Sequence, residues 1–290
     1  MWVTELMNNQ SSLSVVIPIY LRNQEDFNFL KRTLDSVAAQ SFPPSEVILS
    51  NDSASNFDLQ LKNLANLYQT LNIFIVKNLA KQGISTNTNN GISIAKSKYV
   101  QVLHQDDWLC DVDFYRDLEK KSFVTEDRYI FLPWRRLDVS YHPNFDLTSL
   151  LGNNRMGGPS GLIFPSESLV FFDERLSMLC DVDFVFQLYK KFGRPKVFER
   201  VVLEYGVSDG QAQNHISQEQ FIEELNVIFL KHRPNRWKIL VIAWLKYKPD
   251  DTYAMVKNLE RLENSFLLGL FIKVVVVYSR VLSRFRRILT

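Results

Sequence analysis

The sequence is poor in the residues that build disulfide-rich or turn-rich proteins. Its 290 residues include two cysteines, Cys110 and Cys180, ten glycines and ten prolines. Two cysteines cannot form a disulfide framework or a four-cysteine zinc site, and so few glycines and prolines argue against an all-β chain with many tight turns. Residues 1–10 lack a basic stretch followed by an apolar run, so we expect no secretory signal. These absences together predict a cytoplasmic protein with two free thiols.

The remaining composition is that of an ordinary globular protein whose charge is divided unevenly along the chain. Hydrophobic residues make up 46% and charged residues 23%, which excludes disordered and collagen-like chains. The net charge of +2 conceals 13 Lys/Arg against 4 Asp/Glu in residues 231–290, and 21 against 28 in residues 1–230. An acidic body with a basic tail suggests that the body carries the chemistry and the tail meets a negatively charged surface.

Strand and helix patterns alternate over the first third of the chain. Short runs rich in β-branched residues predict buried strands, and apolar residues at helical spacing predict helices between them. The expected strands are residues 14–18, 46–50, 73–76 and 99–103, and the expected helices are residues 27–40, 59–71 and 85–95. This order predicts an α/β fold, with a mostly parallel sheet flanked by helices, that binds ligands at the carboxyl ends of its strands.

The alternation weakens after residue 110. We expect strands at residues 129–134, 160–164 and 197–205, a helix at residues 182–192, and helical structure from residue 219 onward. This change places a boundary after residue 217, with a helical, basic region over residues 218–290. One hexapeptide, LCDVDF, occurs at residues 109–114 and again at 179–184; both copies can be helix starts with Asp as N-cap.

Two adjacent carboxylates, Asp106 and Asp107, follow the fourth expected strand. Neighbouring carboxylates repel one another and need a positive partner, which Mg²⁺ or Mn²⁺ bound together with substrate phosphates would supply. The alternative is an N-cap for a helix that begins near Trp108. Asp52, another carboxylate at the same predicted sheet edge, favours the interpretation as a site.

Five segments resemble, in order and spacing, those of a known family. They are residues 15–22 (VVIPIYLR), 46–55 (EVILSNDSAS), 78–91, 102–107 (VLHQDD) and 172–184. From residue 14 to residue 193 the chain resembles family 2 glycosyltransferases of the GT-A fold, of the type that builds bacterial surface polysaccharides. The resemblance implies that residues 1–217 form a domain that binds a nucleotide-sugar and carries the catalytic residues.

The resemblance also assigns roles at the sheet edge. Pro18 and Tyr20 would border the nucleotide base, and Asp52 would accept a hydrogen bond from it; a turn-capping role is the alternative for Asp52. Asp106 would lie near the ribose, and Asp107 would bind Mn²⁺ or Mg²⁺. Such a cation neutralises charge on the leaving nucleoside diphosphate.

Further residues are placed in the acceptor half of the site by the same resemblance. Asp181 would be the general base, whereas Asp111, at the same place in the other hexapeptide, would be a cap; a second N-cap is the alternative for Asp181. Gly158 and Ser160 would border the acceptor, or form a plain turn. His215, in a loop that resembles one closing over the diphosphate, would add a metal ligand, or lie exposed in solvent.

The sequence departs from the family pattern at four positions. His104 stands where the acidic motif usually begins with Asp, Asn51 replaces the first Asp after the second strand, Thr88 stands where Arg is frequent, and Cys180 replaces a carboxylate before the expected base. These departures leave the final metal carboxylate and the base in place. They affect the expected donor identity and metal affinity rather than the reaction class.

The basic tail predicts contact with a membrane surface. Its apolar stretches are shorter than the roughly 20 residues that span a bilayer. Lys273, Arg280, Arg284 and Arg287 share one face of an expected helix, and a basic amphipathic helix is typical of binding to anionic lipid. A C-terminal helix packed on the body or in a dimer is the alternative. Aromatic residues do not alternate with the basic ones, which disfavours nucleic acid.

Together these patterns predict a metal-dependent inverting hexosyltransferase. It would move a sugar from a nucleotide-diphosphate sugar to the hydroxyl of a polyprenyl-linked oligosaccharide in O-antigen or capsule synthesis, at the inner face of the plasma membrane. One alternative is a non-catalytic sugar-binding or scaffold protein of the same fold. The other, a sugar-phosphate nucleotidyltransferase, needs a glycine-rich phosphate loop that residues 20–24 do not provide.

Overall fold

A computed structural model describes residues 11–79, 82–120, 128–152, 154–207, 217–235 and residue 239. The chain divides into two compact units, one formed by residues 1–145 and 156–214 and the other by residues 146–155 and 215–290. The second unit therefore includes a short segment from the middle of the chain, which the boundary expected after residue 217 does not anticipate. The division into functional domains stays a prediction.

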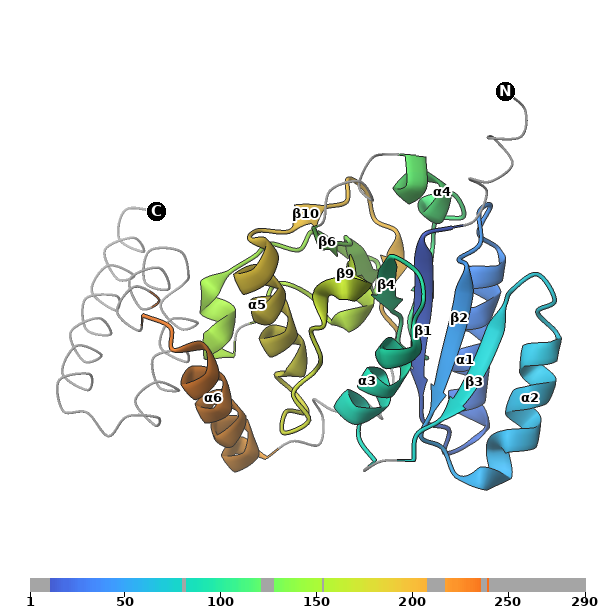
Figure 1. Ribbon diagram of the computed structural model, residues 1–290, viewed down its shortest axis with the longest axis horizontal. Helices are drawn as coiled ribbons and strands as arrows, with labels where there is room; N and C mark the ends of the chain where they lie inside the picture. The colour runs from blue at the N-terminus through green and yellow to red at the C-terminus, as the bar shows by residue number, and fades with distance from the viewer. Residues whose placement is uncertain are drawn as a thin grey trace, which may run out of the picture. The chain divides into compact units, whose positions relative to one another are not determined.

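The first unit is built around a seven-stranded, mostly parallel sheet (Figure 1). Its strands, in spatial order, are β10 (Lys196–Val197), β6 (Ile130–Phe131), β9 (Leu162–Pro165), β4 (Tyr99–Val102), β1 (Leu13–Ile19), β2 (Glu46–Asn51) and β3 (Ile73–Lys77). Strand β9 runs antiparallel to β4 and β6, and the other pairs are parallel. The predicted α/β fold class is confirmed.

Helices cover both faces of this sheet. They are α1 (Gln24–Ala38), α2 (Asp58–Asn66), α3 (Ile84–Ile94), α4 (Phe114–Lys120) and α5 (Cys180–Phe192), with the short 3-10 helices η2 (Ser55–Phe57), η4 (Pro159–Gly161) and η5 (Ser166–Ser168). Helices α1 and α2 lie on one face and α3 on the other (Figure 1). Right-handed crossovers require this arrangement, because the chain crosses the sheet in one direction from β1 to β3 and in the opposite direction from β3 to β4. Helix α1 begins three residues before its apolar pattern because the Asn23 side chain accepts a hydrogen bond from the Asp26 amide.

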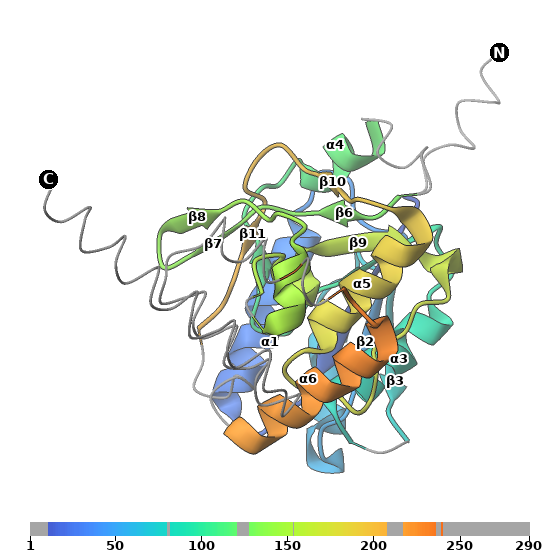
Figure 2. The same ribbon diagram turned by 90° about the vertical axis from the view of Figure 1, so that its left-hand side faces the viewer.

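A second, four-stranded sheet has the order β5 (Trp108–Leu109), β11 (Leu203–Glu204), β7 (Trp134–Arg136) and β8 (Val139–Tyr141). Figure 2 shows β7 and β8 as a hairpin. Two of the expected strands are divided between the sheets: residues 129–134 supply both β6 and the start of β7, and residues 197–205 supply the end of β10 and all of β11.

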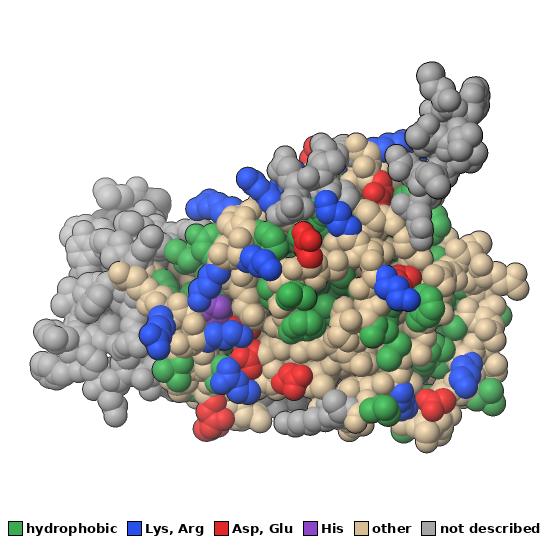
Figure 3. All heavy atoms as spheres, in the orientation of Figure 1, with side chains coloured by type: hydrophobic (Ala, Val, Ile, Leu, Met, Phe, Trp, Pro, Cys, Tyr) green, Lys and Arg blue, Asp and Glu red, His purple; other side chains and the backbone are tan. Residues whose placement is uncertain are grey.

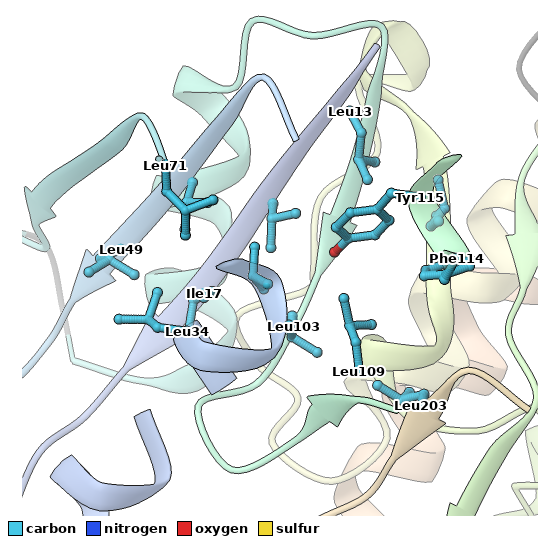
Figure 4. Packing of buried hydrophobic residues seen from close by; sticks show 14 of the residues in the cluster. Leu13, Ile17, Leu34, Leu49, Leu71, Leu103, Leu109, Phe114, Tyr115 and Leu203 are labelled. Carbon is cyan, nitrogen blue, oxygen red and sulfur yellow. The ribbon is translucent and has the colours of Figure 1, made fainter. Parts of the chain in front are cut away.

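Residues of both sheets contribute to one hydrophobic core. Figure 4 shows Tyr115 and Phe114 of α4 among leucines of both sheets, with Leu109 and Leu203 at the side of the second. The hydroxyl of the fully buried Tyr115 donates to Gln101 on β4, so its polar atom is satisfied inside the core. This core fixes the carboxyl end of β4, where the acidic motif begins.

The described part of the second unit consists of the 3-10 helix η3 (Leu147–Leu151) and helix α6 (Gln218–His232). Ser217 and Gln220 form a capping box at the start of α6. No helix among the described residues is long and apolar enough to cross a membrane. The expected amphipathic helix of the basic tail lies outside the described residues. On the face drawn in Figure 3, side chains of both charges are interspersed.

Candidate functional site

Polar residues gather where the parallel strands end. Tyr20 follows β1, Asp52 follows β2 and Asn78 follows β3, while the segment from His104 to Asp107 follows β4. Because β4, β1, β2 and β3 are parallel neighbours, their carboxyl ends meet at one edge of the sheet. The sequence placed these residues at this edge, where open α/β sheets bind their ligands.

The Asp107 carboxylate is buried, and both of its oxygens accept hydrogen bonds. Its Oδ1 accepts a hydrogen bond from the Gly206 amide at 2.9 Å, and its Oδ2 accepts one from the Ser160 hydroxyl at 2.5 Å. Only 6% of Asp107 is exposed. Ser160 lies in η4, just before β9, and Gly206 follows β11, so the orientation of Asp107 depends on segments far along the chain.

Helix α1 supports the acidic motif from behind. The Thr33 hydroxyl lies 2.8 Å from the carbonyl oxygen of Gln105 and 2.6 Å from that of Asp107, and Arg32 donates to the Asp106 carbonyl at 2.8 Å. The Arg32 guanidinium also lies 3.6 Å above the Trp108 ring. Trp108 begins strand β5, so the N-cap interpretation of the two aspartates is wrong: no helix starts there.

Burial shifts the pKa values of Asp107 and His104 in opposite directions. Burial, with the adjacent Asp106 charge, raises the pKa of Asp107 well above its ordinary value, although Ser160, Gly206 and Arg32 favour the charged form. Burial also lowers the pKa of His104, so its imidazole is neutral at neutral pH. The site therefore holds a carboxylate that needs a positive partner beside an uncharged ring with nitrogen donors.

The donor set fits a divalent cation. Ligand atoms of His104, Asp106 and Asp107 all lie within 4.8 Å of one another. The His104 Nε2 is buried and has no hydrogen-bond partner among the described residues. Carboxylate and imidazole groups are common ligands of divalent ions. Sequence reasoning treated His104 as a loss from the motif, and only the fold shows that its ring joins the cluster.

The segment after β1 is tied to the acidic motif by a single side chain. The Gln105 amide accepts from the Tyr20 amide at 2.8 Å and donates to the Tyr20 carbonyl at 3.2 Å. Tyr20 is 51% exposed, so its ring is available to a ligand. Pro18 lies within β1 and pairs with Ser50 of β2. The roles of Tyr20 and Pro18 at a nucleotide base stay predictions.

Asp52 already has partners within the chain. Its Oδ1 accepts from the Asn78 side chain at 3.1 Å, and its Oδ2 accepts from the Gly83 amide at 3.0 Å, at the start of α3. These contacts match the alternative interpretation of Asp52 as a capping residue. They also fix the carboxylate at the sheet edge, and its expected role at the nucleotide base stays a prediction.

The two copies of the hexapeptide have different structures. Asp111 lies before α4, accepts a hydrogen bond from the Asp113 amide and forms an ion pair with Arg200. Asp181 lies in the first turn of α5, whose N-cap is Leu179, so the N-cap interpretation of Asp181 is wrong. Asp181 is half-buried, and its Oδ1 accepts from the Val182 amide at 2.7 Å.

Tyr205 connects the metal motif with the α5 start. Burial raises the pKa of the Tyr205 hydroxyl well above its ordinary value, and the charges of Asp107 and Asp181 raise it further. The hydroxyl accepts from the Gly158 amide at 2.9 Å. Tyr205 thus contacts the Gly158 turn and is influenced by the charges of Asp107 and Asp181.

The glycine turn expected to border the acceptor packs beneath an aromatic stack. The Trp134 ring stacks on Tyr205 at 5.2 Å and on Tyr141 at 5.7 Å between centroids. Gly157 has a φ of +91°, and a Cβ there would lie 2.8 Å from the Trp134 ring, so only glycine fits. Ser160 is fully buried, and its hydroxyl contacts Asp107 and the His104 amide instead of the surface. His215 lies outside the described residues.

Replacing Gly206 by Ala is expected to distort the acidic motif. A Cβ at Gly206 would lie 2.1 Å from the Asp106 carbonyl oxygen, so backbone must move, at a cost of about 1–3 kcal/mol. Thermal unfolding of Gly206→Ala measures this loss. Gly158→Ala is the matched control, because its Cβ would meet Tyr205 at an ordinary 3.5 Å. Equal stabilities of the two variants would contradict the close approach.

The fold and the acidic motif at the sheet edge define the class: this is a GT-A glycosyltransferase fold. Residues 14–120 match the model of the family described as glycosyl transferase family 2. The resemblance predicted from the sequence is confirmed, as is the GT-A fold.

Individual proteins agree with this assignment. A GalNAc(5)-diNAcBac-PP-undecaprenol beta-1,3-glucosyltransferase of Campylobacter jejuni is 32% identical over 98 residues, which are 33% of this chain and 30% of that protein. The aligned stretches span between 15% and 30% of the lengths of curated relatives. Their full activities therefore do not transfer to this chain.

Solved structures share the fold at low sequence identity. S. aureus TarS 1-349 in complex with UDP-GlcNAc has a TM-score of 0.61 at 17% identity, covering 86% of this chain and 80% of that one. The mannosyltransferase PcManGT from Pyrobaculum calidifontis, in complex with GDP-Man and Mn²⁺, has a TM-score of 0.60 at 14% identity, covering 93% and 81%. Both are similar to this chain in architecture.

Proposed function

We propose that this protein is a metal-dependent, inverting glycosyltransferase that moves a sugar from a nucleotide-sugar to an acceptor hydroxyl. The observation that carries the proposal is the arrangement of Asp107, Asp106 and His104 at the carboxyl end of β4. The charges of Asp107 and Asp181 both raise the pKa of Tyr205. A cation site and a second carboxylate whose charges both act on Tyr205 suit a leaving diphosphate and an attacking hydroxyl.

The chain offers separate residues for each part of the donor. Asp107 and Asp106, with His104, would hold the cation, which stabilises negative charge on the leaving nucleoside diphosphate when bound. The exposed Tyr20 and the anchored Asp52 would border the nucleotide base. The similar fold of TarS and PcManGT, each solved with a nucleotide-sugar, supports this part of the proposal.

Asp181 would act as the general base of a single displacement. Its carboxylate would take the proton from the acceptor hydroxyl while that oxygen bonds to the anomeric carbon. The bond between the anomeric carbon and the diphosphate oxygen would break on the opposite side, so the configuration would invert. Asp181 lies in the first turn of α5, and the effect of its charge on the pKa of the Tyr205 hydroxyl supports this role.

A lipid-linked oligosaccharide is the proposed acceptor. The printed name of the Campylobacter jejuni relative contains an undecaprenol-linked acceptor, and residues 231–290 of this chain carry 13 Lys/Arg against 4 Asp/Glu. A basic segment favours an anionic membrane surface, at about 1 kcal/mol for each basic residue near it. We propose that the protein works at such a surface, in the synthesis of surface polysaccharide.

Calorimetric titration with UDP, GDP, dTDP and CDP, each with Mn²⁺ and with EDTA, tests the donor half of the proposal. We expect one nucleotide to bind, and only with Mn²⁺, because the cation links Asp107 to the diphosphate. That nucleotide then selects the sugar donors for transfer to free and polyprenyl-linked oligosaccharides. Folded protein that binds none of the four nucleotides would contradict the proposal.

A further inference from the structure

We infer that His104 is a nitrogen ligand of the divalent cation and makes the site prefer transition-metal ions to Mg²⁺ and Ca²⁺. The inference deepens the proposed function, since it concerns the cation that the donor diphosphate would share. It rests on the placement of the ring, on its unsatisfied nitrogen and on the chemistry of the donor set.

The backbone holds His104 so that its side chain is free for a ligand. The His104 amide donates to the Ser160 hydroxyl at 2.9 Å, and its carbonyl accepts from the Asp107 amide at 3.1 Å. The same Ser160 hydroxyl donates to Asp107. One serine therefore fixes both the backbone of His104 and the carboxylate of Asp107, which keeps their ligand atoms within 4.8 Å of each other.

The ring nitrogen of His104 lacks the hydrogen bond that a structural histidine would make. Its Nε2 is shut off from solvent and has no partner among the described residues. Leaving a buried polar atom unsatisfied costs about 1–3 kcal/mol, and such atoms are rare enough in native proteins to need a reason. A cation between His104, Asp106 and Asp107 would supply the missing partner.

One nitrogen and two carboxylates select among cations. Mg²⁺ and Ca²⁺ favour sites made of oxygen ligands, whereas imidazole suits first-row transition ions, whose affinities rise from Mn²⁺ to Co²⁺. The Arg32 guanidinium, which donates to the Asp106 carbonyl, lies behind the motif and contacts backbone rather than the ligand atoms. We therefore expect Co²⁺ and Mn²⁺ to bind more tightly than Mg²⁺.

Electron paramagnetic resonance of Mn²⁺ bound to the full chain tests this directly, because an imidazole ligand gives a nitrogen hyperfine coupling. Affinities for Mn²⁺, Co²⁺ and Mg²⁺ are measured alongside, with the metal alone. Three variants are compared with the wild type: His104→Ala, His104→Asp and, as the matched control, His142→Ala, which removes an exposed histidine just after β8.

We expect the coupling in the wild type and in His142→Ala, and its loss in both His104 variants. His104→Ala should weaken Mn²⁺ and Co²⁺ binding by at least about tenfold, since even outer-shell losses cost about 10–100-fold. His104→Asp should lower the ratio of the Co²⁺ affinity to the Mg²⁺ affinity, because it replaces the nitrogen ligand by a carboxylate. Thermal unfolding confirms that the variants fold, as expected because the His104 hydrogen bonds come from its backbone.

Coupling that persists in His104→Ala, an affinity within twofold of the wild type, or no Mn²⁺ binding by the wild type would overturn the inference. Its failure is separable from failure of the proposed function. If transfer supported by Mg²⁺ is unchanged in His104→Ala, the protein is a glycosyltransferase but His104 is not a ligand of its cation. If Mn²⁺ shows the nitrogen coupling but the protein has no transfer activity, His104 is a ligand and the proposed reaction is wrong.

Discussion

Replacing Asp107 by Asn is expected to lower sugar transfer by at least about 10³-fold and to remove Mn²⁺ binding. The carboxylate is the buried member of the ligand cluster, and a cation contributes several kcal/mol to stabilising a leaving diphosphate, with each 1.4 kcal/mol worth a factor of ten. Asn can keep the contacts with Ser160 and Gly206, so the loss would reflect charge. Transfer rates at saturating Mn²⁺ measure it, and a variant with more than a tenth of the wild-type rate would remove Asp107 from the metal role.

The same substitution should make the metal-free protein more stable. The folded-state pKa of Asp107 is raised by burial, so the folded chain holds this proton more tightly than the unfolded chain does. This group therefore favours folding at acidic pH, and its contribution is lost as pH rises through the raised pKa. In EDTA, we expect the melting temperature of Asp107→Asn to exceed that of the wild type near neutral pH, by about 2–4 °C for each kcal/mol. The difference should shrink as pH is lowered.

Replacing Asp181 by Asn is expected to lower kcat by roughly 10²–10⁴-fold, the usual contribution of a general base. The affinity for Mn²⁺ and nucleotide should remain, because Asp181 lies in the first turn of α5 and not in the ligand cluster. Steady-state kinetics together with calorimetry separate the two effects. Full transfer activity in Asp181→Asn would show that another group takes the proton from the acceptor hydroxyl.

The sequence itself provides the control. Asp111→Asn changes the same position of the identical hexapeptide, yet Asp111 pairs with Arg200 before α4. We expect transfer activity close to that of the wild type and a loss of at most about 1 kcal/mol of stability, as is usual for a partly exposed ion pair. An equal loss of activity in both variants would point to a structural cause.

The parallel half of the fold was predictable because its strands carry their own signal. The runs that form β1, β2 and β4 are buried along their whole length, and such strands appear in sequence as continuous β-branched segments. From the sequence, residues 129–134 are expected to form one strand, because their hydrophobic pattern does not show that the chain passes from one sheet to the other at Pro133. The two copies of LCDVDF show the same limit, since one precedes a helix and the other begins one.

The carboxylates of the site could be predicted, whereas their support could not. Asp106 and Asp107 follow a recognisable strand, so their place at the sheet edge follows from topology. Ser160 and Gly206, which hold Asp107, are 53 and 99 residues away along the chain. No local pattern marks such residues, and from the sequence the glycine turn at Ser160 is expected to border the acceptor or to be a plain turn, with no sign that it holds Asp107. His104 was read as a missing aspartate for the same reason.

The bridge that Gln105 makes to the Tyr20 backbone has a thermodynamic consequence. It joins the segment proposed to border the base to the turn proposed to hold the cation, so ordering one also orders the other. Two ligands that share one ordered element bind with a mutual coupling, and each must change the affinity of the other by the same factor. The donor would then bind more tightly where the ion is abundant, and transfer would slow in a cell short of that ion.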